Sequence, residues 1–349
     1  MCQRRAASPH NGAMQPRPLL TDSGDVTAPT ARATPTAHSA NPTHPTHPTH
    51  PAPSRDMPPD ARRRRFASAA LGCLTLPGLG ACALALAPPP SQPWEARLRS
   101  DTVALLGEVH DNAEHHRVRT ALLRRAFDSG WRPAVVMEQF DIDRQADIER
   151  SRGERPRDAS HLIARAGATR GWDWPAYEPL IQLVLQFELP LFAGNLPRTL
   201  AARLTREGHE AVFGAARTRE LQLDRTPDAA WQAAQERAID LGHCGALPRS
   251  ALAGMARAQF ARDAVMAHLL IKHAPRGAVL LAGTGHVRRD IGVPRWLTAL
   301  HAPTVLAVGF IETDNEAPAP GVFDAVVSTV PAKRGDPCEA FKVRPLRTG

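Results

Sequence analysis

Five polar side chains come directly after short apolar segments of the sequence, and their types suit ligand binding or proton transfer. They are Glu108, His110, Glu138, Asn195 and His286. The four apolar segments are residues 102–106, 134–137, 189–193 and 278–282. Each segment has the length and composition of a buried strand, and open parallel sheets bind ligands outside the carboxyl ends of their strands. We therefore expect the five side chains to meet at one rim of a sheet.

Imidazole and carboxylate groups leave several chemistries open at this rim. They are ligands for first-row metal ions, and they also act as acid and base or bind an anionic group. Two Gly-x-x-His segments, residues 107–110 and 283–286, place a histidine after each of two strands. The zinc-binding helix motif His-Glu-x-x-His is absent from the sequence. The rim is thus predicted as a metal or ligand site.

Further polar residues are predicted to surround the rim. Gln259, Arg262 and Asp263 have the spacing of one helix face. This spacing favours a buried network against the strand ends, with a surface ion pair as the alternative. His115 and His116 follow His110 in the sequence by a helical turn or more. One of the two is expected to face the rim and the other to be exposed.

Tyr177 is the only tyrosine in the chain and ends the segment Trp-Asp-Trp-Pro-Ala-Tyr at 172–177. The segment has the pattern of a helix start, where a nearby anion such as a phenolate is stabilised. A tyrosinate oxygen is an accepted axial ligand of haem iron. Judged from the residues alone, packing among aromatic side chains is the favoured role of Tyr177, and iron ligation is the alternative.

The spacing of the apolar segments indicates an α/β fold. Residues 304–308 have the pattern of a further buried strand, and residues 323–330 that of an edge strand. Between the strands lie helix-length periodic stretches, one with Asn112 as its cap and one with Pro175 in its first turn. Residues 197–274 contain no convincing strand and are predicted as a helical insertion between the third and fourth main strands. The alternation predicts a mostly parallel sheet flanked by helices.

The net charge of +8 is concentrated near the N-terminus. Residues 1–82 carry nine Arg and four Asp, which accounts for +5 of the total. The remaining residues are only mildly basic, so a nucleic-acid partner is not indicated.

The N-terminal region has the layout of an export signal. Residues 62–65 are four arginines, residues 66–79 are largely apolar, and Leu-Gly-Ala-Cys at 79–82 resembles a bacterial lipobox. We expect residues 57–82 to be a lipoprotein signal peptide with Cys82 as the lipidated residue. A membrane-anchor helix is the alternative.

Export has consequences for the rest of the chain. Residues 1–56 are expected to be a disordered extension or a mis-assigned start. Ala83 follows Cys82, which favours anchoring at the outer membrane, facing the periplasm. That compartment is oxidising, so Cys244 and Cys338 are predicted to form a disulfide, with two separate thiols as the alternative.

Several motifs occur in order along the chain. They are Leu-Leu-Gly-Glu-Val-His-Asp-Asn at 105–112 with His115 and His116, Met-Glu-Gln-Phe at 137–140, Trp-Asp-Trp at 172–174 with Tyr177, Ala-Gly-Asn-Leu-Pro-Arg at 193–198, Gln259 with Arg262 and Asp263, Ala-Gly-Thr-Gly-His-Val-Arg at 282–288, and Asp-Pro-Cys at 336–338. Taken together they resemble the ChaN family, haem-binding uptake lipoproteins of the Tiki superfamily. The resemblance extends from about residue 94 to residue 341. We therefore expect residues 83–349 to form one ChaN-like domain.

The resemblance implies that the chain binds haem between two copies of itself. Tyr177 would be the axial ligand of ferric iron, and Trp174 would supply apolar surface beside it. His115, His116 or His161 would contact a propionate. An outer-membrane haem receptor is the partner expected for uptake.

The wider superfamily implies an alternative function. It resembles metal-dependent hydrolases that use paired Gly-x-x-His segments and acidic residues. In that case Glu108, His110, Glu138 and His286 would hold a divalent metal or act as acid and base. A third hypothesis is an interaction protein with an inactive site. Of the three, haem binding is the main expectation and an enzyme is the alternative.

Overall fold

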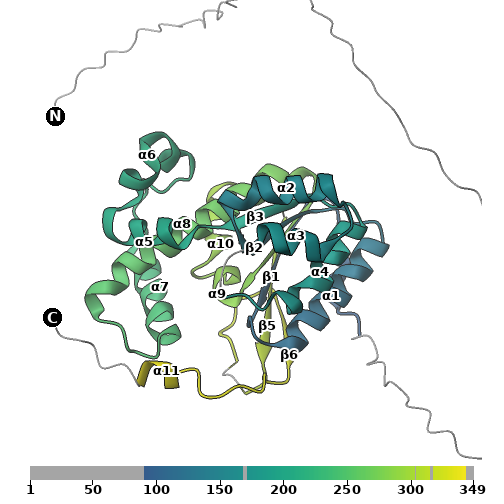
Figure 1. Ribbon diagram of the computed structural model, residues 1–349. Coiled ribbons are helices and arrows are strands. Elements are labelled where there is room, and N and C mark those ends of the chain that lie inside the picture. Colours follow the sequence, from purple (N-terminus) through teal and green to yellow (C-terminus); the bar gives the residue numbers. More distant parts are fainter. Residues whose placement is uncertain (1–89, 168–170, 303, 315–316, 343–349) are drawn as a thin grey trace, which may run out of the picture. The chain divides into compact units, whose positions relative to one another are not determined.

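A six-stranded sheet forms the centre of the computed structural model, and every strand pair in it is parallel (Figure 1). The strands are β1 Thr102–Glu108, β2 Ala134–Asp141, β3 Leu191–Asn195, β4 Ala278–Gly283, β5 Thr304–Glu312 and β6 Ala325–Thr329. Their order across the sheet is β3-β2-β4-β1-β5-β6. Because the strands are parallel, their carboxyl ends lie along one edge. The predicted α/β fold with a parallel sheet is confirmed.

The structure describes residues 90–167, 171–302, 304–314 and 317–342. The predicted extension at 1–56, the signal peptide at 57–82 and Cys82 lie outside the described residues. Within the described part of the chain, no helix is both long enough and apolar enough to cross a membrane.

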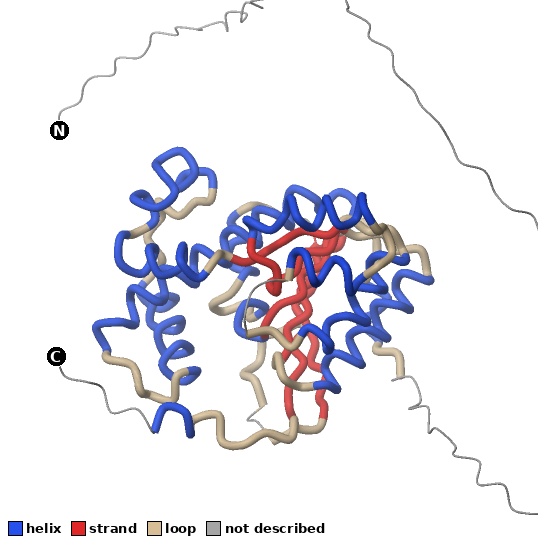
Figure 2. The backbone as a smooth tube through the Cα atoms, in the orientation of Figure 1, coloured by secondary structure: helices blue, strands red, loops and turns tan. Residues whose placement is uncertain are grey.

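Alternate residues of the central strands face opposite sides of the sheet. In β1, Ala104 and Leu106 belong to one buried cluster, whereas Val103 and Leu105 belong to another. All four side chains are fully buried. A parallel sheet buried on both faces needs helices on both faces. Figure 2 shows the red strands with blue helices on either side.

Two groups of helices cover the two faces of the sheet (Figure 1). The cluster that contains Leu106 is completed by α1 Ala113–Asp128, α2 Gln145–Glu154, α3 Ala159–Ala166 and α4 Trp174–Gln186. The cluster that contains Leu105 is completed by α5 Arg198–Glu207, α8 Arg249–His273, α9 Thr284–Val287 and α10 Val293–Ala299.

The segment between β3 and β4 is helical, as predicted. It consists of α5, α6 His209–Glu220, α7 Ala229–Gly242 and the long α8. Along α8, Phe260, Val265 and Leu270 are buried in the same apolar cluster as Leu105 of β1. The long helix therefore fixes the insertion to one face of the sheet.

Local sequence signals position several element ends. Asn112 caps α1 by accepting hydrogen bonds from the backbone N–H groups of Glu114 at 2.9 Å and His115 at 3.1 Å. Pro175 lies in the first turn of α4, where its missing N–H is tolerated. β3 begins at Leu191, two residues later than predicted, because Pro190 has no N–H to donate to the ladder.

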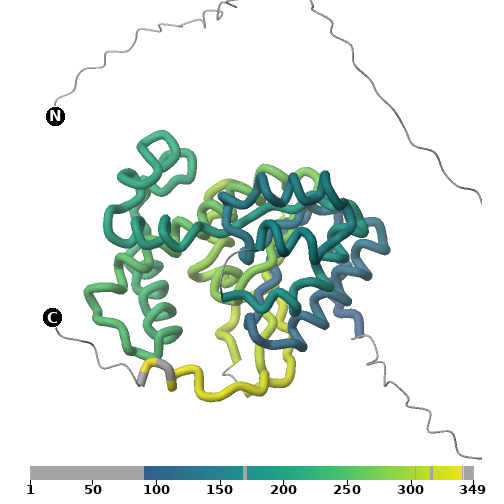
Figure 3. Tube along the Cα trace, in the orientation of Figure 1, coloured from purple at the N-terminus to yellow at the C-terminus, as the bar shows by residue number. Residues whose placement is uncertain are grey.

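The C-terminal segment returns to the helical insertion. After β6 the yellow chain runs along the bottom of the view toward α11 Glu339–Lys342 (Figure 3). A disulfide joins Cys244 to Cys338, with 2.02 Å between the sulfur atoms and 5.7 Å between the Cα atoms. The bond attaches the segment after β6 to the loop that follows α7.

Candidate functional site

Glu108 is the centre of a buried hydrogen-bonded cluster at the end of β1. Its Oε1 accepts from the hydroxyl of Tyr177 at 2.7 Å and from the amide of Gln139 at 3.2 Å. Its Oε2 forms an ion pair with Arg119, and both side chains are fully buried. Burial acts to raise the pKa of Glu108, but Arg119 and the neighbouring imidazoles outweigh it and lower the pKa. Glu108 is therefore an anion held by its partners.

Carboxylates and imidazoles alternate across the rim. Nδ1 of His110 lies 3.2 Å from Oε1 of Glu108, and its Nε2 lies 4.0 Å from Oε2 of Glu138. Oε1 of Glu138 lies 3.5 Å from Nε2 of His286, whose Nδ1 lies 2.5 Å from Asp263. The ends of β1, β2 and β4 thus bring together groups that are up to 178 positions apart in the sequence, from Glu108 to His286.

The charges in this series fix two protonation states. Burial acts to lower the pKa of His286, but Glu138 and Asp263 outweigh it and raise the pKa to about 10. Burial acts to raise the pKa of Glu138, but His286, His110 and the backbone N–H of Gly283 outweigh it and lower the pKa to about 2. The Gly283 N–H donates to Glu138 at 2.7 Å. At neutral pH an imidazolium at position 286 therefore faces a carboxylate at position 138.

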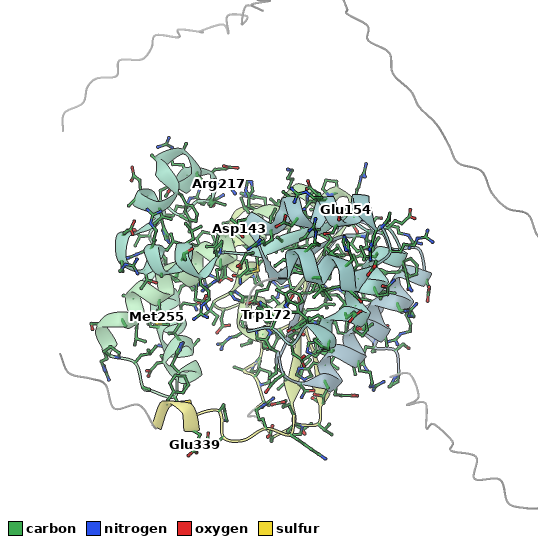
Figure 4. The ribbon with its side chains drawn as sticks, in the orientation of Figure 1. Asp143, Glu154, Trp172, Arg217, Met255 and Glu339 are labelled. Carbon is green, nitrogen blue, oxygen red and sulfur yellow. A yellow bond between two sulfur atoms is a disulfide. The ribbon has the colours of Figure 1, made fainter. Side chains whose placement is uncertain are left out.

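His110 is the most exposed member of the series. Its side chain is 42% exposed, against 10% for Glu138 and none for Glu108. Burial acts to lower the pKa of His110, but Glu108 and Glu138 outweigh it and raise the pKa. Trp172, which Figure 4 labels near the middle of the view, stands edge-on to the imidazole with 4.8 Å between ring centroids. His110 can therefore give a proton or a hydrogen bond to an anionic group that reaches the rim.

Asn195 and the predicted helix network adjoin this series. Arg262 donates to Oδ1 of Asn195 at 3.2 Å and to Oε1 of Gln259 at 2.6 Å. Asp263, the next residue of α8, is the partner of His286. Burial lowers the pKa of Arg262. The structure places Gln259, Arg262 and Asp263 against the strand ends and not at the surface.

His115 and His116 are both buried, so the expectation that one of them is exposed is wrong. Nδ1 of His115 accepts a hydrogen bond from the backbone N–H of Val109 at 3.0 Å, and burial lowers its pKa to about 4. Nε2 of His116 lies 2.8 Å from the carbonyl oxygen of His110, and its Nδ1 lies 3.4 Å from Glu108. The cap at the start of α1 turns both rings inward. In this arrangement neither ring is open to a propionate.

Tyr177 does not present its oxygen to a ligand in this structure. The residue is 1% exposed, and its hydroxyl donates to Glu108. Its ring packs edge-on against His116, with 4.6 Å between centroids. Burial and the adjacent Glu108 raise the pKa of the phenol, so the phenol keeps its proton. As a tyrosinate ligand of ferric haem, Tyr177 does not fit this arrangement.

Two other residues expected near haem lie outside the cluster. Trp174 is half-buried and packs against Phe140, with 5.0 Å between ring centroids. His161 on α3 lies 2.8 Å from Glu154 on α2 and is 17% exposed. Within the described residues, no hydrogen bond, ion pair or ring contact joins either side chain to Glu108.

The rim carboxylates are already paired with protein groups. Among the residues that the structure describes, no group of three or more His, Cys, Asp and Glu side chains is placed to hold a metal ion. Glu108 is paired with Arg119 and Tyr177, and Glu138 is paired with His286. The divalent metal considered from the sequence therefore has no ligand set in this structure.

Two members of the cluster were missed by the sequence analysis. Arg119 lies on the face of α1 that buries Leu122 and Leu123, and an arginine on an apolar helix face is a signal of a buried ion pair. Gln139 follows Glu138 directly, so the two side chains leave opposite faces of β2. Nothing in the sequence shows that the Gln139 amide reaches Glu108.

Comparisons with solved structures agree with the parallel α/β fold. ChaN of Campylobacter jejuni, described with cofacial haem binding, has a TM-score of 0.50 and 18% identity over 63% of this chain and 85% of that chain. An erythromycin esterase EreC mutant in its open conformation has a TM-score of 0.35 and 12% identity over 64% of this chain and 74% of that one. A Bacillus cereus protein has a TM-score of 0.31 and 13% identity, over 66% and 73% of the two chains. The last two similarities are too weak to support an argument.

Comparison with sequence families gives the assignment. A search of curated proteins gave no match. The family model described as haem-binding uptake, Tiki superfamily, ChaN matches residues 94–297, which is more than half of the 349 residues. The matched range contains all the rim residues described above. The chain therefore belongs to the ChaN family of haem-binding uptake proteins in the Tiki superfamily.

Proposed function

We propose that this chain is a lipid-anchored haem-binding protein of haem or iron uptake. The observation that carries the proposal is the family match over residues 94–297. The similar Campylobacter jejuni protein is described with cofacial haem binding. Two haems held face to face bury apolar macrocycle surface that would otherwise contact water. We extend this arrangement to the present chain as a homodimer that holds its haems at the interface.

The proposed location is the periplasmic side of the outer membrane, with Cys82 as the lipid anchor and an outer-membrane haem receptor as the partner. The lipobox and Ala83 support this location. The disulfide between Cys244 and Cys338 supports an oxidising compartment.

The axial ligand expected from the family resemblance is Tyr177. In the present arrangement its oxygen can reach iron only after the hydrogen bond to Glu108 breaks and the buried ring is exposed. Ligation by Tyr177 is therefore a prediction that requires a rearrangement of the rim.

A hemin titration of the full chain tests haem binding. We expect saturable binding with a protein-specific absorption spectrum, together with a doubling of mass in solution. Absence of saturable binding would contradict the proposal. Saturable binding by a chain that stays monomeric would contradict the dimer alone.

A second candidate function is acid–base hydrolysis at the rim. The series Asp263, His286, Glu138 and His110 favours it, because three buried groups orient and charge one exposed imidazole. A neutral His110 could take a proton from an attacking water, and its protonated form could return the proton to a leaving group.

The test of this candidate is a screen of ester substrates across pH. We expect His110→Ala and His286→Ala to abolish turnover, while His301→Asn, an exposed change outside the rim, leaves it unchanged. Unaltered turnover in both rim variants would exclude rim catalysis.

A further inference from the structure

A small pocket lies between α5, α7 and α8, beside the rim. Its volume is about 360 Å³, which is near the lower end of the range of about 300–1,000 Å³ for ligand pockets. α8 packs against both α5 and α7, and Figure 1 shows the three helices next to one another. None of the lining residues belongs to the cluster around Glu108. The pocket suits a small ligand or one compact group of a larger one.

The facing sides of α5 and α8 form two walls of the pocket. Each helix contributes residues at positions i, i+4 and i+7, which lie on one helix face. They are Arg198, Ala202 and Thr205 on α5, and Met255, Gln259 and Arg262 on α8. Figure 4 labels Met255 on this part of α8. Ala202 contributes only a methyl group, which leaves the space between the helices open.

The pocket carries positive charge without a carboxylate. Arg198 and Arg262 both line it, and no Asp or Glu is among its described lining residues. The two guanidiniums give the walls a charge of +2. The amide of Gln259 uses its oxygen to accept from Arg262, so its nitrogen is left to donate. The pocket therefore offers cations and a hydrogen-bond donor, which is the lining that an anion requires.

Arg262 has only neutral hydrogen-bond partners within the described residues. Its Nε donates to Oδ1 of Asn195 at 3.2 Å, and its Nη1 donates to Oε1 of Gln259 at 2.6 Å. Its Nη2 makes no hydrogen bond in the described part of the chain and stays accessible. One edge of this half-buried guanidinium is thus open to a ligand.

The carboxylates near Arg262 do not pair with it. Glu138 and Asp263 are both paired with His286. Burial acts most strongly to lower the pKa of Arg262, the nearby carboxylates oppose it, and Arg198 adds to the lowering. Two like charges that share a half-buried pocket repel each other, and an anion between them would relieve this repulsion.

Arg198 is able to turn toward the same anion. It is exposed, and within the described residues no hydrogen bond or ion pair engages its guanidinium. Guanidinium groups bind phosphate through paired N–H donors. A phosphate monoester carries a charge of about −1.5 to −2 at pH 7, which matches two arginines, whereas a single carboxylate would leave one of them uncompensated.

We propose that the pocket between α5, α7 and α8 binds the phosphate group of a phosphomonoester. Arg198 and Arg262 are its cationic partners, and the amide nitrogen of Gln259 is a further donor. Because Arg262 also contacts Asn195 at the end of β3, the bound phosphate lies beside the rim. The proposal goes beyond haem binding and hydrolysis and depends on neither.

The test is isothermal titration of the full chain at low ionic strength with three probes, inorganic phosphate, sulfate and acetate. We expect saturable binding of one phosphate per chain and competition by sulfate, which is a dianion of similar shape. Acetate should bind more weakly by roughly tenfold or more, because it loses a hydrogen bond to a charged group. Acetate that binds as tightly as phosphate would overturn the assignment to phosphate.

Variants then locate the site. Arg198→Gln and Arg262→Gln should each weaken phosphate binding by roughly tenfold or more. Arg198 is exposed, so its replacement does not disturb the fold. Ala202→Leu keeps both charges and should abolish binding by filling the pocket. The matched control is Arg206→Gln, which removes an exposed arginine from the same helix outside the pocket and should leave the affinity unchanged.

Three results would contradict the proposal. The first is the absence of saturable phosphate or sulfate binding to the native chain. The second is unchanged phosphate affinity in the double variant Arg198→Gln with Arg262→Gln, which would place the anion elsewhere. The third is an equal loss in Arg206→Gln, which would mean that the anion responds only to the overall charge of the helix. None of these results bears on hemin binding, so the two proposals can fail separately.

Discussion

Replacing Glu108 by Gln should destabilise the protein strongly, because Arg119 would keep its charge without a counter-charge. Arg119 and Glu108 are both fully buried. Removing one partner of a buried ion pair costs about 3–5 kcal/mol, since the other charge is left without compensation. The substitution also weakens the hydrogen bond from the Tyr177 hydroxyl.

The measurement is thermal and chemical unfolding of native and Glu108→Gln chains. For a protein of this size, 3–5 kcal/mol corresponds to a fall in Tm of roughly 6–20 °C. The matched control is the double variant Glu108→Gln with Arg119→Met, in which both charges are absent. The double variant should recover much of the loss, because replacing both members of a buried pair is often nearly neutral.

Two results would refute this reasoning. A loss below about 1 kcal/mol in Glu108→Gln would mean that solvent or another group compensates Arg119. A double variant that is less stable than Glu108→Gln would mean that the arginine stabilises the fold by packing and not by charge.

Three further predictions concern the pH profile, the disulfide and Gly283 at the end of β4. Because the pKa of His286 is raised from 6.5 to about 10, its stabilising charge is complete below about pH 6.5 and is lost as pH rises toward 10. The urea midpoint of the native chain should fall over that interval, and a His286→Asn variant that shows the same fall would contradict the assignment. Cys338→Ser should lower the free energy of unfolding by about 2–5 kcal/mol, because the bond closes a long loop with a separation of 94 residues; a reductant should then have no further effect on this variant. Gly283→Ala should displace His110, because a Cβ atom there would lie 2.7 Å from Nε2 of His110; an unchanged His110 pKa measured by NMR would contradict the close approach.

Much of the fold could be predicted from the sequence, because the strands are short apolar runs with buried faces on both sides. The same apolar segments also predicted the rim. Because the strands are parallel, the residues that follow them, such as Glu108, Glu138 and His286, lie along one edge of the sheet. The capping residue Asn112 also specified where α1 begins.

The partners within the rim could not be predicted in the same way. Tyr177 has the residue type of a haem ligand, but its orientation depends on how α4 packs against α1. That packing turns its hydroxyl toward Glu108 and buries it. The ion pair with Arg119 depends on the same packing.

The central claim is that this chain binds haem, and the most direct test is the stoichiometry of hemin binding to the full chain. We would titrate the purified chain with hemin, follow the absorption spectrum, and measure iron and protein in the isolated complex. The account predicts saturation at one haem per chain. A spectrum that rises linearly without saturation, with no haem retained by the isolated protein, would contradict it.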